Sequence, residues 1–261
     1  MTEALYVPSG DRFSPTELTT SPWSTDACHG GPAAALLTRE IQRLEPETFH
    51  LARITIEMLS IVPRIDVMVT GDVLRPGKRV QLSTAELSTV SGEVLAKATA
   101  WSLRHREPFP LPPEAAGSVG RLPPPEELPN DTFPGADWVD YYGDAQERRV
   151  VYGDFLRPGP AAVWFRLKVP VVAGEDPTSE QRVVAMADSA NGISSVATFD
   201  DLLYINPDLT VHLARAPQGE WMAMDATSYL DPSGRGLSDT VLYDRGGYLG
   251  RANQTLFVDE R

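Results

Sequence analysis

The chain of 261 residues contains a single cysteine, Cys28, and only four histidines. One cysteine excludes an internal disulfide framework and is typical of a cytoplasmic protein. The CxxC, HExxH, GxSxG and P-loop patterns are absent from the sequence. Metal-dependent, serine-hydrolase and nucleotide-hydrolase chemistry therefore have no motif to support them, and we expect neither a metal ion nor a cofactor.

Basic residues are also few: 23 Lys and Arg stand against 36 Asp and Glu, which gives a formal net charge of −13. Such a chain would repel phosphates, so we do not expect it to bind nucleic acid. No apolar run approaches about 18 residues, so no membrane span is expected. The first residues, MTEALYVPSGDRF, lack a basic segment followed by an apolar one, and we expect no secretory signal.

Proline is abundant in one stretch, EPFPLPPEAAGSVGRLPPPEELPN, which covers residues 107–130. A segment this rich in proline and poor in β-branched residues predicts a stiff, extended linker. It divides the chain into an N-terminal half, residues 1–106, and a C-terminal half, residues 131–261.

Each half shows one amphipathic helix followed by a series of strands. In the first helix, Gly31 to about Arg43, apolar residues recur at steps of three and four. Alternating segments predict the strands. This order predicts an α+β fold in which an antiparallel sheet curves around the helices, and the two halves join edge to edge into one sheet. The expected strands are 51–63, 66–77, 78–89 and 92–104, then 147–155, 161–171, 202–216, 219–230, 234–245 and 247–258, and the second helix is 179–192.

These elements carry a pattern that resembles the acyl-CoA thioesterase II (TesB-type) family, which has the double-hotdog fold. The resemblance covers nearly the whole chain outside the proline-rich segment. It implies hydrolysis of an acyl-CoA thioester to the free acid and CoA by water attack, and it implies homo-oligomers. The matching stretches are PWSTDACHGGPAAALLTR, GDVLRPGKRVQ, AMADSANG, INPDLTVHLARAPQGEWMAMDATS and GRANQTLFV.

By this resemblance, the catalytic residues are Asp188 at the end of the second helix, Asn206 on the next strand and Gln254 on the last strand. The bacterial thioesterase II pattern has Thr where this chain has Asn206, so the substrate range of that pattern is not carried over. Asp188 is the expected base, and we expect burial to raise its pKa. The two amides can hold one water in a fixed orientation, because each has a donor and an acceptor.

The sequence His29-Gly30-Gly31 stands at the start of the first helix. Glycine allows close approach of the backbone, and the free N–H groups of a helix start favour negative charge. Gly30 and Gly31 are therefore expected to bind the developing oxyanion, with Gly31 polarising the carbonyl, and His29 to orient the substrate or hold the loop. The alternative is a simple helix start, with Pro32 at its favoured first position.

Alignment of the two halves suggests how the site is assembled. Thr38 falls on Asp188, Ser179-Glu180-Gln181 fall on the His-Gly-Gly sequence, and Thr55 and Thr99 fall on Asn206 and Gln254. Each half lacks what the other has. Single-hotdog thioesterases resemble dimers in which one subunit's helix start faces the other's carboxylate. We therefore predict one composite site per chain and one degenerate site.

The CoA phosphates need a basic patch in this acidic chain. The densest candidate is Arg75, Lys78 and Arg79, although the pattern slightly favours a hairpin with solvated charges over a phosphate site. The acyl group needs an apolar tunnel, for which Trp23, Met58 and Met186 are candidate lining residues.

Two alternatives stay open beside an acyl-CoA thioesterase. One is a non-catalytic acyl-CoA binding or sensor protein. The other is an acyl-thioester hydratase or dehydratase, in which Asp pairs with a His five residues further on; position 193 is Ile here, which argues against it. A nucleophilic Cys28 is disfavoured, because neighbours in sequence rarely have the geometry of a catalytic pair.

Overall fold

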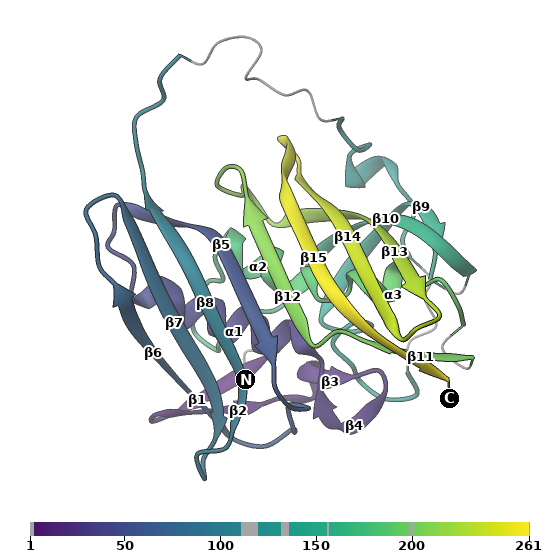
Figure 1. The fold of residues 1–261 in the computed structure, drawn as a ribbon, viewed down its shortest axis with the longest axis horizontal. Helices are drawn as coiled ribbons and strands as arrows, with labels where there is room; N and C mark the ends of the chain where they lie inside the picture. The colour runs from purple at the N-terminus through teal and green to yellow at the C-terminus, as the bar shows by residue number, and fades with distance from the viewer. Residues whose placement is uncertain (1–2, 111–119, 132–135, 156, 199–200, 261) are drawn as a thin grey trace.

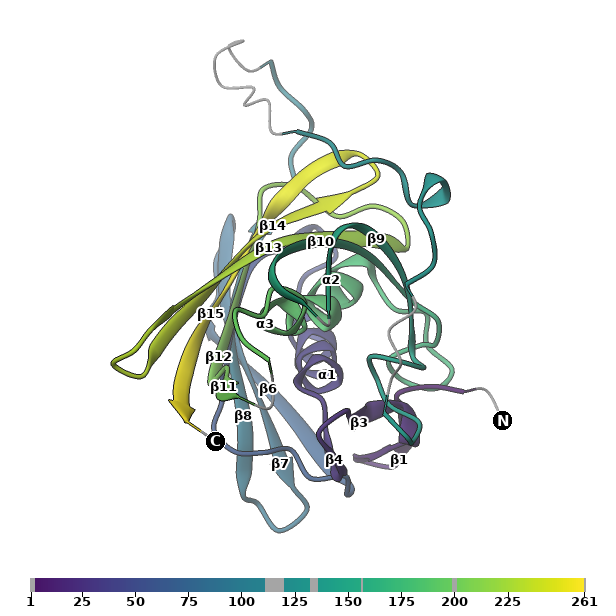
Figure 2. The same ribbon diagram turned by 90° about the vertical axis from the view of Figure 1, so that its right-hand side faces the viewer.

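The computed structural model describes residues 3–110, 120–131, 136–155, 157–198 and 201–260. Within them, one 13-stranded antiparallel sheet curves around the helices (Figures 1 and 2), which confirms the predicted α+β, double-hotdog plan. No helix of the described residues is long and apolar enough to cross a membrane. The helices are α1 (Gly30–Arg43), α2 (Ser179–Ala187) and α3 (Ala190–Ile193).

The strand order is β1-β2-β6-β7-β8-β5-β12-β15-β14-β13-β10-β9, and β11 pairs with β15. A separate hairpin, β3 (Thr20–Ser21) with β4 (Ser24–Cys28), precedes α1. In the N-terminal half the sheet strands are β1 (Tyr6–Ser9), β2 (Arg12–Pro15), β5 (Phe49–Met58), β6 (Val67–Arg75), β7 (Val80–Thr89) and β8 (Val94–Arg104). In the C-terminal half they are β9 (Gln146–Asp154), β10 (Arg157–Leu167), β11 (Leu202–Ile205), β12 (Asp208–Leu213), β13 (Trp221–Asp231), β14 (Arg235–Asp244) and β15 (Gly247–Glu260).

The two halves join where β5 pairs with β12, with Thr55 opposite Thr210. Beneath this seam, α1 packs on α2. The chain forms α1 there because its apolar face, which includes Leu37 and Ile41, is fully buried. Because α1 comes from one half and α2 from the other, the start of one helix lies beside the end of the other.

Two predicted elements are interrupted in the structure. The strand expected over 202–216 divides into β11 and β12 at Asn206-Pro207, since proline has no N–H to give to a sheet. The helix expected over 179–192 divides into α2 and α3 after Asp188, which is the C-cap of α2. Both breaks occur beside the candidate site, where they leave Asp188 and Asn206 outside regular hydrogen bonding.

The proline-rich segment lies partly outside the described residues, which omit 111–119. Its later part is packed rather than extended. Leu122 and Leu128 lie against a small apolar cluster that includes Trp164, and the Trp164 indole donates to the carbonyl of Pro123 at 2.9 Å. A short 3₁₀ turn, Pro125–Glu127, follows.

The residue-level alignment of the halves is off by one at two places. If α1 and α2 are superposed at their first residues, Gly30 and Ser179, Asp188 falls on Arg39 and not on Thr38. On the sheet, Gln254 is buried on the inner face, whereas Thr99 belongs to the outer row, between the buried residues Ala98 and Ala100. A shift by one residue reverses the face of every side chain in a strand, so Thr99 is not the counterpart of Gln254.

Candidate functional site

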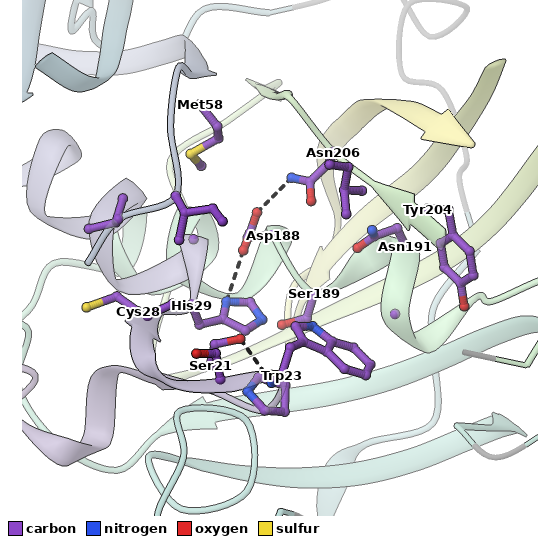
Figure 3. A pocket seen from close by; sticks show the side chains of 18 of the residues that line it. Ser21, Trp23, Cys28, His29, Met58, Asp188, Ser189, Asn191, Tyr204 and Asn206 are labelled. Carbon is purple, nitrogen blue, oxygen red and sulfur yellow. Dashed lines mark hydrogen bonds and ion pairs between the residues drawn. The ribbon is translucent and has the colours of Figure 1, made fainter. Parts of the chain in front are cut away.

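A cavity of about 560 Å³ opens at the seam between the halves, at the start of α1 and the end of α2. Its walls are the β3–β4 turn, the loop that follows β5, α3, and the segment from β11 to Pro207. Figure 3 shows His29, Asp188 and Asn206 meeting at its inner end. Among the candidate apolar residues, Trp23 and Met58 line this cavity. Met186 is buried in the core instead.

His29 and Asp188, which are 159 positions apart in the sequence, form the central pair. His29 Nδ1 lies 2.9 Å from Asp188 Oδ2, and both side chains are largely buried. His29 is the N-cap of α1 and Asp188 the C-cap of α2, so the packing of the two helices sets this contact. The other imidazole nitrogen of His29 is turned toward the space beside Ser189 and Trp23 (Figure 3).

The pKa of Asp188 is lowered, contrary to the expectation from burial. Burial of the carboxyl is the largest single influence and would raise its pKa. The opposing influences together outweigh it: the hydrogen bond and charge of His29, the hydrogen bond from Asn206 and the backbone N–H of Gly31. Asp188 is therefore an anion, and its carboxylate already accepts several hydrogen bonds.

Gly30 and Gly31 allow α1 to approach α2 closely. A Cβ on Gly30 would lie 2.6 Å from Asp188 Oδ2, and one on Gly31 would lie 2.3 Å from the carbonyl oxygen of Ala185. Larger residues at these positions would separate the helix start from the carboxylate. The two glycines thus serve contact between the two helices, in addition to any contact with a ligand.

The backbone N–H of Gly31 points at the pair formed by His29 and Asp188. It lies 3.1 Å from His29 Nδ1 and also contributes to the lowered pKa of Asp188. An anionic Asp188 requires the proton on Nδ1, and Gly31 then donates to the carboxylate. Gly31 is buried and does not line the cavity, whereas Gly30 does. The N–H of Gly30, at the first position of α1, has no preceding helical acceptor.

Asn206 and Gln254 both contact Asp188, but in different ways. The side-chain amide of Asn206 donates to Asp188 Oδ1 at 2.9 Å. Gln254 is buried away from the cavity lining; its amide donates to the backbone carbonyl of Asp188 and accepts from the N–H of Asn191, both at 3.1 Å. Gln254 therefore holds the break between α2 and α3, and its two polar atoms are engaged there.

The structure adds Tyr141, which the sequence analysis does not single out. Its hydroxyl donates to the carbonyl of Ala185 at 2.9 Å, and its ring centroid lies 5.0 Å from that of His29. The side chain is fully buried between the two helices. No sequence signal marks it, because it stands in an irregular segment ahead of β9.

The basic cluster does not reach this cavity. Arg75, Lys78 and Arg79 are exposed at the β6–β7 turn, and the strand register places Val80 level with Leu103, and Leu103 level with His50. His50 is eight residues before Met58 on β5, which is roughly 26 Å along the strand. The cluster therefore lies at the opposite end of the sheet from the cavity, which disfavours its assignment to the CoA phosphates at this site.

Cys28 lines the cavity but is buried, and its pKa is raised chiefly by that burial. Its Sγ lies 3.4 Å from the hydroxyl of Thr19, not against His29. A raised pKa disfavours the thiolate, so the side chain behaves as a structural cysteine.

Comparison with known proteins places these residues in a family. The family model of the acyl-CoA thioesterase N-terminal domain matches residues 19–103, and that of the acyl-CoA thioesterase C-terminal domain matches residues 125–258. No curated protein matches the sequence.

Several solved structures share the fold across almost the whole chain. One is the acyl-CoA thioesterase II TesB2 of Mycobacterium marinum, with 18% identity, a TM-score of 0.68, and coverage of 97% of this chain and 94% of that one. A second is a hot dog protein of unknown function from Alicyclobacillus acidocaldarius, with 15% identity, a TM-score of 0.75, and coverage of 98% and 96%. The TesB protein of Mycobacterium avium subsp. paratuberculosis has 15% identity, a TM-score of 0.68, and coverage of 97% and 95%. At these identities the likeness concerns the fold, and the two family models, which together span both halves, show that the chain belongs to the acyl-CoA thioesterase family.

Proposed function

We propose that the protein hydrolyses acyl-CoA thioesters at the cavity between its halves. The observation that carries this proposal is the contact between His29 and Asp188, at 2.9 Å, at the inner end of a largely apolar cavity. Membership of the acyl-CoA thioesterase family supports the reaction class. The pair supplies a base fixed by a buried carboxylate, which is what activation of a water requires.

In the proposed mechanism, His29 and Asp188 act as a unit. Asp188 accepts from Nδ1–H and so leaves Nε2 of His29 without a proton, facing the cavity. A water held there attacks the thioester carbonyl carbon while Nε2 takes its proton. The carbon–sulfur bond then breaks, and the imidazolium returns the proton to the CoA sulfur. The products are the free acid and CoA. The anionic Asp188 stabilises the imidazolium, as in other carboxylate–histidine pairs.

This assignment differs from the sequence-based one, in which Asp188 itself is the base. A carboxylate with a lowered pKa and donors on both oxygens is a weak acceptor for the proton of water. Asn206 keeps that carboxylate in place, and Gln254 positions the turn that carries it. Gly30 offers the N–H that stabilises the oxyanion of the tetrahedral intermediate.

We also propose that the chain divides into an N-terminal repeat, residues 1–106, and a C-terminal repeat, residues 131–261, which are joined by the proline-rich segment, residues 107–130. Matches to separate N- and C-terminal family models, over residues 19–103 and 125–258, support a division in this region of the chain. Homo-oligomer formation stays a prediction.

The test is release of CoA thiol from saturated acyl-CoA substrates of two to sixteen carbons, followed with a thiol-reactive dye. We expect Asp188→Asn and His29→Gln each to lower kcat by about 100-fold or more. Glu175→Gln is the matched control, because it removes a carboxylate at the other end of the helix pair, 45% exposed and paired with Arg39. It should stay within about twofold of the parent. Absence of release from every substrate, or undiminished release by Asp188→Asn, contradicts the proposal.

A hydratase or dehydratase is a second candidate, favoured by the same contact. The lack of a histidine at position 193 argued against it, but the structure brings His29 to Asp188 from the other half. Such a pair can also add or remove a proton on carbon 2 of an acyl thioester. Incubation with a 2-enoyl-CoA separates the two: hydrolysis releases thiol, whereas hydration adds one water with the thioester intact. Binding with neither product would indicate an acyl-CoA sensor.

A further inference from the structure

The backbone conformation at Gly192 does not require a glycine. It lies within α3, and its φ is not among the positive values that favour glycine. Glycine inside a helix is less stable than alanine, because it loses more backbone freedom on folding. A glycine at such a position calls for another explanation, either close packing or open space.

Packing does not provide that explanation. Among the described residues, a Cβ on Gly192 would meet one atom, Cε2 of Phe155, at an ordinary contact distance of 3.6 Å. By contrast, a Cβ on Gly30 or Gly31 would come within 2.6 Å of its neighbours. The space beside Gly192 belongs to the cavity, which this residue lines.

The wall around Gly192 is the sheltered apolar part of the cavity. Tyr142 and Tyr204 are buried there, and Phe155 and Leu202 are half-buried. The opposite wall is more exposed: Leu59 and Ile61 are 56% and 76% accessible. An acyl chain gains most by leaving water, so it is expected on the sheltered side. The amide-containing arm of CoA suits the exposed side, where Ser24 and Ser60 also line the cavity.

The Gln254 amide places Gly192 close to Asp188. It donates to the carbonyl of Asp188 and accepts from the N–H of Asn191, the residue before Gly192, both at 3.1 Å, and Asp188 and Gly192 line the same cavity. A chain that leaves a carbonyl at Asp188 toward the sheltered wall therefore passes position 192 within its first few carbons.

We infer that Gly192 determines the length of the acyl group, by leaving open a passage in the cavity alongside α3 and Phe155, which both line it, for an unbranched aliphatic chain. This inference rests on the proposed function of the same site. A larger residue at position 192 would close the passage and leave room for short acyl groups alone.

The experiment compares Gly192→Ala and Gly192→Leu with the parent over acyl-CoA substrates from acetyl to palmitoyl. We expect Gly192→Leu to lower kcat/KM for octanoyl and longer groups by about 10-fold or more, a size typical of steric discrimination in apolar pockets. Acetyl and butyryl groups should stay within about threefold, and Gly192→Ala should fall between the parent and Gly192→Leu. Ser60→Leu adds similar bulk at the exposed rim and should change short and long substrates alike.

Binding of unreactive S-alkyl-CoA thioethers, measured by calorimetry, separates this inference from the proposed hydrolysis. If the parent releases no CoA but Gly192→Leu weakens long thioethers and spares short ones, hydrolysis is contradicted and the passage is supported. An equal loss for short and long chains, or no dependence on length, overturns the inference. Because Gly192→Ala suits helical backbone, its melting temperature should equal or exceed that of the parent, so a folding defect does not account for its profile.

Discussion

The two ends of the α1–α2 pair have the same architecture and different chemistry. At one end, the start of α1 meets the end of α2, and His29, Asp188 and Asn206 form a connected polar group beside the cavity. At the other end, the start of α2 meets the end of α1. There Arg39 forms a two-pronged hydrogen bond with Glu175, and Gln42 accepts from Thr178 and from Gln181.

The difference between the two ends rests on a few side chains. Arg39 occupies the position that Asp188 holds at the first end, so the carboxylate is replaced by a cation that is already neutralised. Its partner Glu175 has a lowered pKa, for which the hydrogen bond from Arg39 is the main cause. The polar groups of the second end satisfy one another, whereas those of the first leave one imidazole nitrogen facing the cavity.

A carboxyl at each end with a shifted pKa extends this contrast. Asp188 has several donors and a lowered pKa. Glu45, which follows α1 at the second end, has a pKa raised to about 7, chiefly by burial and despite a hydrogen bond from Ser102. The more deeply buried Asp188 thus has the lower pKa and the half-buried Glu45 the higher one, because the number of donors around each carboxyl differs.

The largest expected effect follows from the close approach of the helices at the first end. In Gly31→Ala the new methyl group would lie 2.3 Å from the carbonyl oxygen of Ala185, so one helix must move. We expect a loss of about 1–3 kcal/mol in the free energy of unfolding, as is typical of overpacking. We also expect about 100-fold lower kcat, because a shift near 1 Å displaces His29 from Asp188. Chemical denaturation and the thiol-release assay measure the two effects.

Glu180→Ala is the control for that substitution, since residue 180 is likewise the second residue of its helix. It should change the free energy of unfolding by less than about 1 kcal/mol, a surface and helix-end effect, and leave kcat unchanged. Equal losses of activity in the two variants would show that the ends do not differ in function.

Much of the fold could be predicted from sequence periodicity. Apolar steps of three and four give α1 within one residue of its start, and alternation gives the longer strands of both halves. The short strands β1 to β4 are missed, since two to five residues carry little periodic signal. The alignment of the two halves is off by one residue at two places because periodicity does not fix the residue at which a helix or strand begins. In the folded chain, the cap residues fix the start of each helix and the buried face of the sheet fixes which strand residues point inward. Both are features of the tertiary structure.

The sequence could predict which residues belong to the candidate site, but not how they contact one another. The order of motifs identified Asp188 and Asn206, and burial of Asp188 could be expected from its apolar helix. The direction of its pKa shift could not, because it depends on donors from two other segments, the start of α1 and the turn after β11. Likewise, the two ends of the Gln254 amide bind backbone groups of the α2–α3 break, and this break is visible only in the folded chain.

A smaller effect concerns the pH dependence of activity. Because the pKa of Asp188 is lowered, this carboxyl stays an anion through the ordinary range of an aspartate, so the acid limb of kcat/KM comes from uptake of a proton by Nε2 of the proposed base, His29. Asn206→Ala removes a donor from Asp188, and Asn206→Asp also adds a negative charge at 2.9 Å from Oδ1, so both changes stabilise the imidazolium of His29. The acid limb should therefore move to higher pH in the order parent, Asn206→Ala, Asn206→Asp, with a total shift of about one unit or more. An unchanged limb in Asn206→Asp would contradict an anionic Asp188 in the reaction.

The smallest effect tests the carboxyl of the second end. The folded pKa of Glu45, about 7, exceeds its usual 4.5, so the folded state holds this proton more tightly than the unfolded state. Its contribution is fully present below pH 4.5 and is lost as pH rises toward 7, because ionisation then favours the unfolded chain. Glu45→Gln keeps the shape without the charge, so its unfolding free energy should exceed that of the parent by about 1 kcal/mol at pH 8, after allowance for partial exposure. The difference should shrink toward pH 4.5, and denaturation across that range measures it. A difference that grows on acidification would mean that the Glu45 carboxylate is stabilised in the fold, as at the Asp188 end, and would remove the contrast between the two ends.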